Sequence, residues 1–193
     1  MKLKFNKKNC VVTVISVIFV LVMSISVFAT DTYNQYILYG GGYAHRNATF
    51  NNHTSYTAAL TDAANNWYYS NTPVYMDGTG GTTINSNLYD CIEPNESYAG
   101  IYYPQQREWG IGRAHAFAIY LNKSKLTYTS SMSEISSIIA HEFGHAFCLD
   151  DNPSNFDPYK DLSIMNYGCY KGNIYKPTVN DEAGVNAATF VPE

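Results

Sequence analysis

The stretch SMSEISSIIAHEFGHAFCLDD, residues 131–151, decides more about the fold than any other part of the chain. Ser131 and Glu134, three residues apart, form a capping box, which is typical of the start of a helix. The apolar positions that follow recur at helical spacing and predict one buried face: Ile135, Ile138 and Ile139. We therefore expect a helix from Ser131 to about residue 147.

The same helix contains the pattern His141-Glu142-Phe143-Gly144-His145. Residues four apart lie one above the other on one helical face, so both imidazoles can bind a single tetrahedral zinc ion. Glu142 then sits beside the metal, where it can take a proton from a bound water. The alternative is a helix that happens to carry two surface histidines.

The residues that follow this pattern also match parts of a longer sequence signature. Counting on from His141, the long signature H-E-x-x-H-x-x-G-x-x-H puts Cys148 at the glycine and Asp151 at the third ligand. Residues 163–167, Ser-Ile-Met-Asn-Tyr, look like a Met-turn around Met165. Here the chain resembles the metzincin zinc endopeptidases, in particular small bacterial matrixin-like or snapalysin-like enzymes, the latter known for an aspartate as third ligand.

This resemblance implies a fold and an activity. The fold is α+β and zincin-like: a twisted mixed sheet with a long early helix, an active-site helix and a C-terminal helix. The activity is hydrolysis of peptide bonds by a zinc-activated water, with His141, His145 and Asp151 as ligands and Glu142 as general base. Met165 would support the ligand histidines from below. The substrate would lie extended along a sheet edge, for which we expect Tyr98–Tyr103.

The resemblance also gives roles to residues beyond the ligands. Tyr167 follows Met165 by two positions and either supports the oxyanion, as a tyrosine does in astacins and serralysins, or forms an aromatic wall. Cys148 ends the active helix and Cys169 follows the Met-turn, segments that pack together in the family. This implies a Cys148–Cys169 disulfide with Cys91 free.

The rest of the chain predicts an α+β domain with helices packed against one sheet. An apolar face predicts a helix over about 55–69: Tyr56, Ala59, Leu60, Ala63, Ala64 and Trp67. Thr178 and Asp181 form a second capping box, so a helix should run to about Ala188. Strands are expected at 73–76, 98–103 and 114–121, while the polar segment 82–97 stays unassigned.

The first 29 residues resemble a cleaved signal peptide. Four lysines precede an apolar run, Cys10–Phe28, and the small residues Val27 and Ala29 predict cleavage after Ala29. The alternative is a single membrane anchor, because the run is nearly long enough to span a bilayer. Cleavage would leave one domain, 30–193, secreted to the extracellular space and without a membrane anchor.

The charge balance bears on partners. The whole chain has 12 basic and 16 acidic residues and a net charge of −4, and removal of residues 1–29 leaves eight basic residues, a charge of −8. An acidic domain without a basic stripe argues against nucleic-acid binding. We expect a monomer that acts on a protein or peptide.

The sequence also contains residues that could hold further metal ions. His115 precedes a strand in a segment similar to one that binds a second, structural zinc in matrixins, and Asp150, Asp157 and Asp161 could hold calcium. His45 and His53 flank an Asn-rich segment that we expect to be a solvated loop.

Three functions remain open from the sequence. The leading one is a secreted zinc endopeptidase. The second is a catalytically silent metzincin-fold binding or toxin-like module, against which the intact Glu142 counts. The third is a zinc hydrolase that acts on a non-peptide substrate.

Overall fold

A computed structural model describes residues 42–78, 85–107, 112–127, 130–151, 163–166, 174–188 and 190. All of them lie in the unit Tyr33–Glu193. The elements in chain order are β1 (Asn47–Thr49), β2 (Asn51–His53), α2 (Thr57–Tyr68), β3 (Tyr75–Asp77), β4 (Asn87–Cys91), β5 (Gly100–Arg107), β6 (Ala114–Asn122), α3 (Met132–Ala146) and α4 (Val179–Ala187). The domain is α+β with a mixed sheet, as the sequence predicted.

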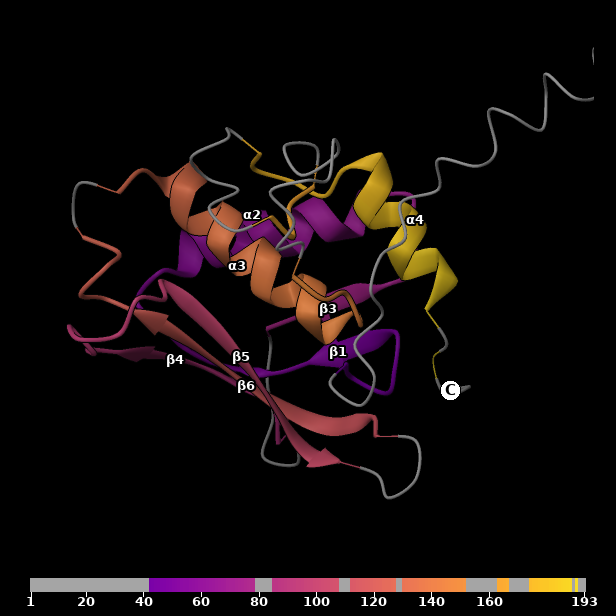
Figure 1. The fold of residues 1–193 in the computed structure, drawn as a ribbon, viewed down its shortest axis with the longest axis horizontal. Coiled ribbons are helices and arrows are strands. Elements are labelled where there is room, and N and C mark those ends of the chain that lie inside the picture. The colour runs from indigo at the N-terminus through magenta and orange to yellow at the C-terminus, as the bar shows by residue number, and fades with distance from the viewer. Residues whose placement is uncertain are drawn as a thin grey trace, which may run out of the picture. The chain divides into compact units, whose positions relative to one another are not determined.

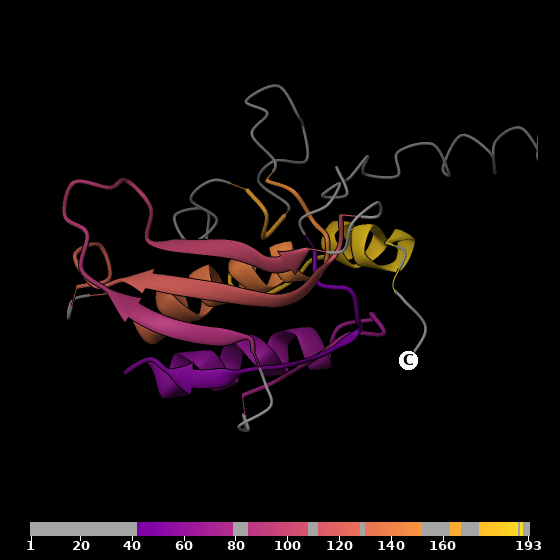
Figure 2. The same cartoon turned by 90° about the horizontal axis from the view of Figure 1, so that it is seen from below.

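The main sheet has four strands in the order β2-β4-β6-β5 (Figure 2). β2, β4 and β6 are parallel to one another, whereas β5 is antiparallel to β6. β1 and β3 form a separate two-stranded parallel sheet. Within the part of the chain that the structure describes, β5 is therefore an edge strand.

The central strand β6 is the most deeply buried. All its residues except His115 and Tyr120 are buried, in agreement with a strand that is paired on both sides and covered by a helix. β5 contains no fully buried residue, as expected for an edge strand. The core of the sheet is thus centred on β6, and β5 borders it.

Two helices cover the same side of the main sheet (Figure 1). α3 packs on β5 and β6, and α2 packs on α3 and β3. α2 buries the predicted apolar face, and its Trp67 donates a hydrogen bond from Nε1 to the carbonyl of Ala140 in α3, at 2.9 Å. This bond fixes the early helix to the helix that contains the histidines.

The predicted helices are confirmed, with both capping boxes. The Ser131 hydroxyl accepts from the N–H of Glu134, whose side chain accepts from the N–H of Ser131. Thr178 and Asp181 form the equivalent pair at the start of α4. No helix among the described residues is long and apolar enough to cross a bilayer. The predicted signal peptide, residues 1–29, lies outside the described residues and stays a prediction.

One expectation about the β structure was wrong, and one segment without an expectation contains a strand. The unassigned segment 82–97 contains β4, which lies between β2 and β6 in the main sheet. The segment between His45 and His53, expected to be a loop, contains β1 and β2. These strands are short and rich in Asn, and they form through backbone pairing with distant strands rather than through a local apolar pattern.

Candidate metal centre

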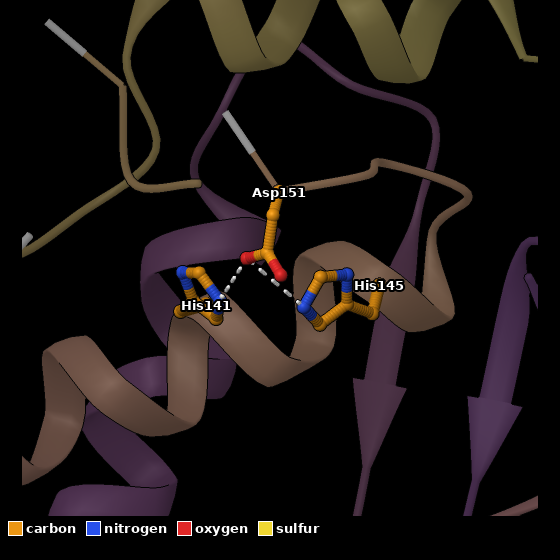
Figure 3. A group of neighbouring side chains, drawn as sticks. All are labelled: His141, His145 and Asp151. Atoms are coloured by element: carbon orange, nitrogen blue, oxygen red, sulfur yellow. Dashed lines mark ion pairs between the residues drawn. The ribbon is translucent and has the colours of Figure 1, made fainter. Parts of the chain in front are cut away.

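α3 places His141 and His145 on the same face, one turn apart (Figure 3). Their ring centroids are 4.9 Å apart and the ring planes are nearly perpendicular. His141 Nδ1 lies 2.8 Å from the carbonyl oxygen of Ile164, and His145 Nδ1 lies 2.9 Å from that of Leu149. A backbone carbonyl therefore holds each ring at Nδ1, and the Nε2 atom of each ring points away from that carbonyl.

Asp151 reaches the histidines because the chain reverses sharply after α3. The reversal uses Cys148, which has φ +71°, and a hydrogen bond from Leu149 N–H to the Gly144 carbonyl at 2.9 Å. Asp151 Oδ1 then lies 3.0 Å from Nε2 of His141 and 3.6 Å from Nε2 of His145 (Figure 3). The sequence spacing thus selected the residue that the fold brings to the two imidazoles.

The donor and acceptor roles in this group fit a metal ion. A carbonyl oxygen can only accept, so each Nδ1 must donate, and in a neutral imidazole this leaves a lone pair on Nε2. Two nitrogen lone pairs and a carboxylate oxygen, all within 4.8 Å of one another, thus face a common centre. Acceptors that converge in this way are stabilised by a cation, and His141, His145 and Asp151 can hold one.

Burial keeps His145 neutral. The pKa of its imidazole is lowered to about 4, first by desolvation and then by the neighbouring His141, against the opposing effects of Asp151 and the hydrogen bond to Leu149. A neutral imidazole is the form that binds a metal. The ring is therefore ready to bind an ion at neutral pH without first losing a proton.

Glu142 lies beside this group and is only 5% exposed. Its pKa is raised to about 7, chiefly by desolvation and further by Asp151, while His141 and the backbone N–H of Tyr102 oppose the rise. A carboxyl group with a pKa near neutrality can both accept and release a proton under ordinary conditions. The position and the pKa both suit a general base.

Gly100 at the start of β5 makes room for this carboxylate. A Cβ at Gly100 would lie 2.8 Å from Glu142 Oε1 and 2.9 Å from its Cγ, closer than side-chain contacts normally come. The Tyr102 ring, on the same strand, lies 6.2 Å from the His145 ring, centroid to centroid. β5 therefore contacts both the carboxylate and one of the histidines.

Met165 lies directly against α3. It is fully buried, and a Cβ at Gly144 would be 2.2 Å from its Sδ, so any larger residue at this point of the helix would displace the Met165 side chain. The preceding residue, Ile164, supplies the carbonyl that holds His141. The predicted turn thus lies next to the helix that contains the two histidines, and its backbone takes part in orienting His141.

The turn is itself held by α4. The buried carboxylate of Asp181 accepts hydrogen bonds from the Ser163 hydroxyl at 2.6 Å and from the Ile164 N–H at 3.0 Å, in addition to those from Thr178. Ile164 therefore connects Asp181 on one side with His141 on the other. The sequence indicated Asp181 only as a helix cap.

The structure describes two of the cysteines that the disulfide prediction concerns, Cys91 and Cys148. Cys91 and Cys148 are free thiols in the described residues, and the predicted Cys148–Cys169 bridge stays a prediction because its second cysteine lies outside them. The Cys148 thiol is buried against Gly42 and contacts the guanidinium of Arg113. Cys169 lies outside the described residues, as does Tyr167, and the role proposed for Tyr167 stays a prediction.

The additional metal sites gain little support. His45 and His115 lie side by side, with ring centroids 5.9 Å apart, but His141, His145 and Asp151 form the one group of three potential ligands in the described residues. The Asp150 carboxylate turns back to accept the N–H of Asp151 at 2.8 Å. The other two acids considered for calcium, Asp157 and Asp161, lie outside the described residues.

Sequence reasoning missed Gly100, Tyr102 and the second role of Asp181. Gly100 acts through the absence of a side chain, Tyr102 through its backbone N–H, and Asp181 through a carboxylate that bonds to a distant turn, and no motif marks these contacts. A scan of the chain against protein-family models finds no match, and a search of curated proteins finds no similar sequence, so the geometry of the site itself must support any function.

Proposed function

We propose that the chain is a secreted zinc endopeptidase of the metzincin type. The observation that carries the proposal is the convergence of His141, His145 and Asp151 on one point, with the buried Glu142 beside them. Zinc suits this set because catalytic zinc sites use three nitrogen or oxygen ligands from the protein and keep a fourth position open. The helix–turn spacing of the three ligands also supports the metzincin resemblance.

Zinc, when bound, would act as a Lewis acid for the attacking water and the scissile carbonyl. Glu142 takes a proton from the water and passes it to the leaving amine. Its desolvated position supports this role, because burial brings the pKa of the carboxyl to about 7. The N–H of Tyr102 holds the carboxylate in place during the transfer.

The substrate would bind along β5, which contains part of the predicted edge Tyr98–Tyr103. Edge strands accept extended peptides through backbone hydrogen bonds. β5 reaches the metal centre at Gly100 and Tyr102, so a peptide added there would place a peptide bond near Glu142. This proximity favours a peptide over a small non-peptide substrate.

Zinc content and proteolysis, measured together, test the proposal. The protein from Thr30 to Glu193 is compared with Glu142→Gln, which keeps the size of the side chain and an acceptor for Tyr102. We expect about one zinc per chain in both proteins, and cleavage of casein or gelatin that is reduced about a hundredfold to ten thousandfold in the variant.

Other outcomes favour the competing functions. Zinc bound to both proteins without cleavage by either would favour a catalytically silent binding or toxin-like module. Hydrolysis of a small ester that depends on Glu142, with casein and gelatin left intact, would favour a non-peptide hydrolase. Failure of both proteins to bind zinc would contradict the proposed metal centre.

A further inference from the structure

Two arginines lie at one end of the β5–β6 pair. Arg107 is the last residue of β5, and Arg113 directly precedes β6. Because Arg107 pairs with Ala114 in the antiparallel ladder, the two arginines occupy neighbouring positions on adjacent strands. Arg107 is exposed and Arg113 is half-buried, so neither side chain is closed off from solvent.

The same end of the strand pair borders the metal centre. The Arg113 guanidinium contacts Sγ of Cys148, whose N–H donates to the His145 carbonyl at 3.0 Å. The Tyr102 ring lies next to the ring of His145. Burial and Cys148 raise the pKa of the Tyr102 hydroxyl, whereas the positive charges of Arg107 and Arg113 oppose this rise. Both charges therefore act on the region around His145, where the proposed reaction takes place.

Neither arginine has a carboxylate partner among the residues that the structure describes. Lys123, at the opposite end of β6, shows the contrast, because its ammonium lies 3.5 Å from the Asp90 carboxylate. Two neighbouring guanidinium groups are stabilised by an anion, and the planar guanidinium matches the geometry of a carboxylate in particular. The chain has 16 acidic and 12 basic residues, so an incoming carboxylate is attracted here although the molecule as a whole repels it.

We infer that Arg107 and Arg113 bind a carboxylate side chain of the substrate, and thereby select peptides with Asp or Glu at a fixed distance from the scissile bond. This inference rests on the proposed function and specifies its substrate class. Because both arginines lie at one end of β5, the acidic residue is favoured on one side of the scissile bond only. Acidic residues elsewhere in the substrate gain nothing, since the net charge of the chain is negative.

Pairs of peptides test this selectivity. A cleavage site in casein is identified by mass spectrometry, and peptides spanning it are made with Gln or with Glu at each position in turn, on both sides of the scissile bond. We expect kcat/KM to be about threefold to tenfold higher with Glu at one position or two adjacent ones, on one side only. Glu should give no advantage at the other positions. Equal values for Glu and Gln at every position would refute the inference.

Arg107→Gln and Arg113→Gln test the assignment from the enzyme side. Each variant should lose most of the preference for Glu at the selected position, and the double variant should lose all of it. Lys123→Gln is the matched control, because it removes the same charge from the opposite end of β6 and should keep the wild-type preference. A preference that survives in the double variant, or that falls equally in Lys123→Gln, would contradict the inference.

A structural role of Arg113, through its contact with Cys148, has a different signature. Loss of that contact alone would change kcat/KM for the Glu and the Gln peptides alike and leave their ratio as in the wild type. Salt gives a second distinction, because ion pairs near the surface are screened by it. At about 1 M salt the preference for Glu should fall markedly. A preference that does not depend on salt would contradict selection by charge.

Binding provides a readout besides turnover. The zinc-loaded Glu142→Gln protein should bind a labelled Glu peptide about threefold to tenfold more tightly than the matched Gln peptide, as measured by fluorescence anisotropy. Equal affinities would refute the binding of a carboxylate.

The failure of this inference can be told from that of the proposed function. If the wild-type protein cleaves no casein site, the proposed function fails and the inference falls with it. If it cleaves casein and loses this activity in Glu142→Gln, but Glu and Gln peptides are cleaved equally, the proposed function stands and only the selectivity is wrong.

Discussion

Asp150 and Asp151 are adjacent in the chain, but their carboxylates make different contacts. Asp151 Oδ1 faces both Nε2 atoms, whereas the Asp150 carboxylate accepts the N–H of Asp151. Asp151→Asn should therefore lose most of the bound zinc, because the neutral amide oxygen replaces an anionic ligand. Asp150→Asn keeps an acceptor for the N–H and should retain the metal. Metal content after dialysis checks both, and zinc lost from Asp150→Asn alone would mean that the ligand is assigned wrongly.

Glu142 and His145 should affect the stability of the metal-free protein in opposite directions. The pKa of Glu142 rises from 4.5 to about 7 on folding, so its stabilising contribution is complete below pH 4.5 and lost as the pH rises to 7. The pKa of His145 falls from 6.5 to about 4, so its contribution is complete above pH 6.5 and lost as the pH falls to 4. The two dependences should largely cancel in the wild type.

Glu142→Gln removes the pH dependence of stability that comes from Glu142 and leaves that of His145. The free energy of unfolding of this variant, relative to the wild type, should rise by about 3 kcal/mol between pH 4.5 and pH 7. Urea unfolding in the presence of a chelator measures the difference at each pH. A difference that does not depend on pH would mean that the Glu142 carboxyl titrates alike in the folded and unfolded chains.

At the scale of elements, the helices could be predicted from signals that lie within a few residues of one another. Some strands could not, because they depend on pairing with distant segments of the chain. The capping boxes at Ser131 and Thr178 rest on residues three apart, and both are present in the structure. β4 contains a single fully buried side chain, Leu88, and owes its place to pairing with β6. No window of a few residues contains that information.

The difference between local and non-local signals also applies to the candidate site. The histidines and Asp151 lie within eleven residues of chain, so helical geometry and counting sufficed to predict them. Gly100 lies about forty residues before Glu142 in the chain, and its importance depends on how β5 packs on α3. That packing can be seen only in the fold.

α4 should stabilise the metal centre through Asp181. Removal of its carboxylate in Asp181→Ala leaves the donors of Ser163, Ile164 and Thr178 buried without their acceptor. We expect the metal-free protein to lose about 3 kcal/mol of unfolding free energy. Zinc should bind about tenfold to a hundredfold more weakly, because Ile164 no longer holds His141 firmly.

Glu182→Ala is the matched control for this effect. Glu182 is the next residue of α4 and bonds to Asn71 at the surface. Its removal should cost less than about 1 kcal/mol and leave zinc affinity unchanged. Urea unfolding and competition with a zinc-binding dye measure the two quantities. Equal zinc affinity in Asp181→Ala and the wild type would refute the connection through Ile164.

At the scale of the whole molecule, zinc binding should stabilise the fold. A ligand that binds only the folded state adds about 2.7 kcal/mol at a hundred times its Kd. For a domain of this length the gain corresponds to a rise in Tm of about 5–10 °C. Thermal melts in zinc-buffered solution and in EDTA check the shift, with Asp151→Asn as the protein that should not respond. A zinc-dependent rise of the same size in that variant would contradict the site.

The connection from Asp181 through Ile164 to His141 also sets an order of events during biosynthesis. A growing chain that ends at residue 151 already contains all three ligands, yet it lacks the carbonyl that orients His141 and the helix that fixes this carbonyl. The metal centre is therefore completed only after residue 181 has left the ribosome and α4 has docked. Under the proposed function, full proteolytic competence therefore requires that α4, the last helix of the described chain, is in place.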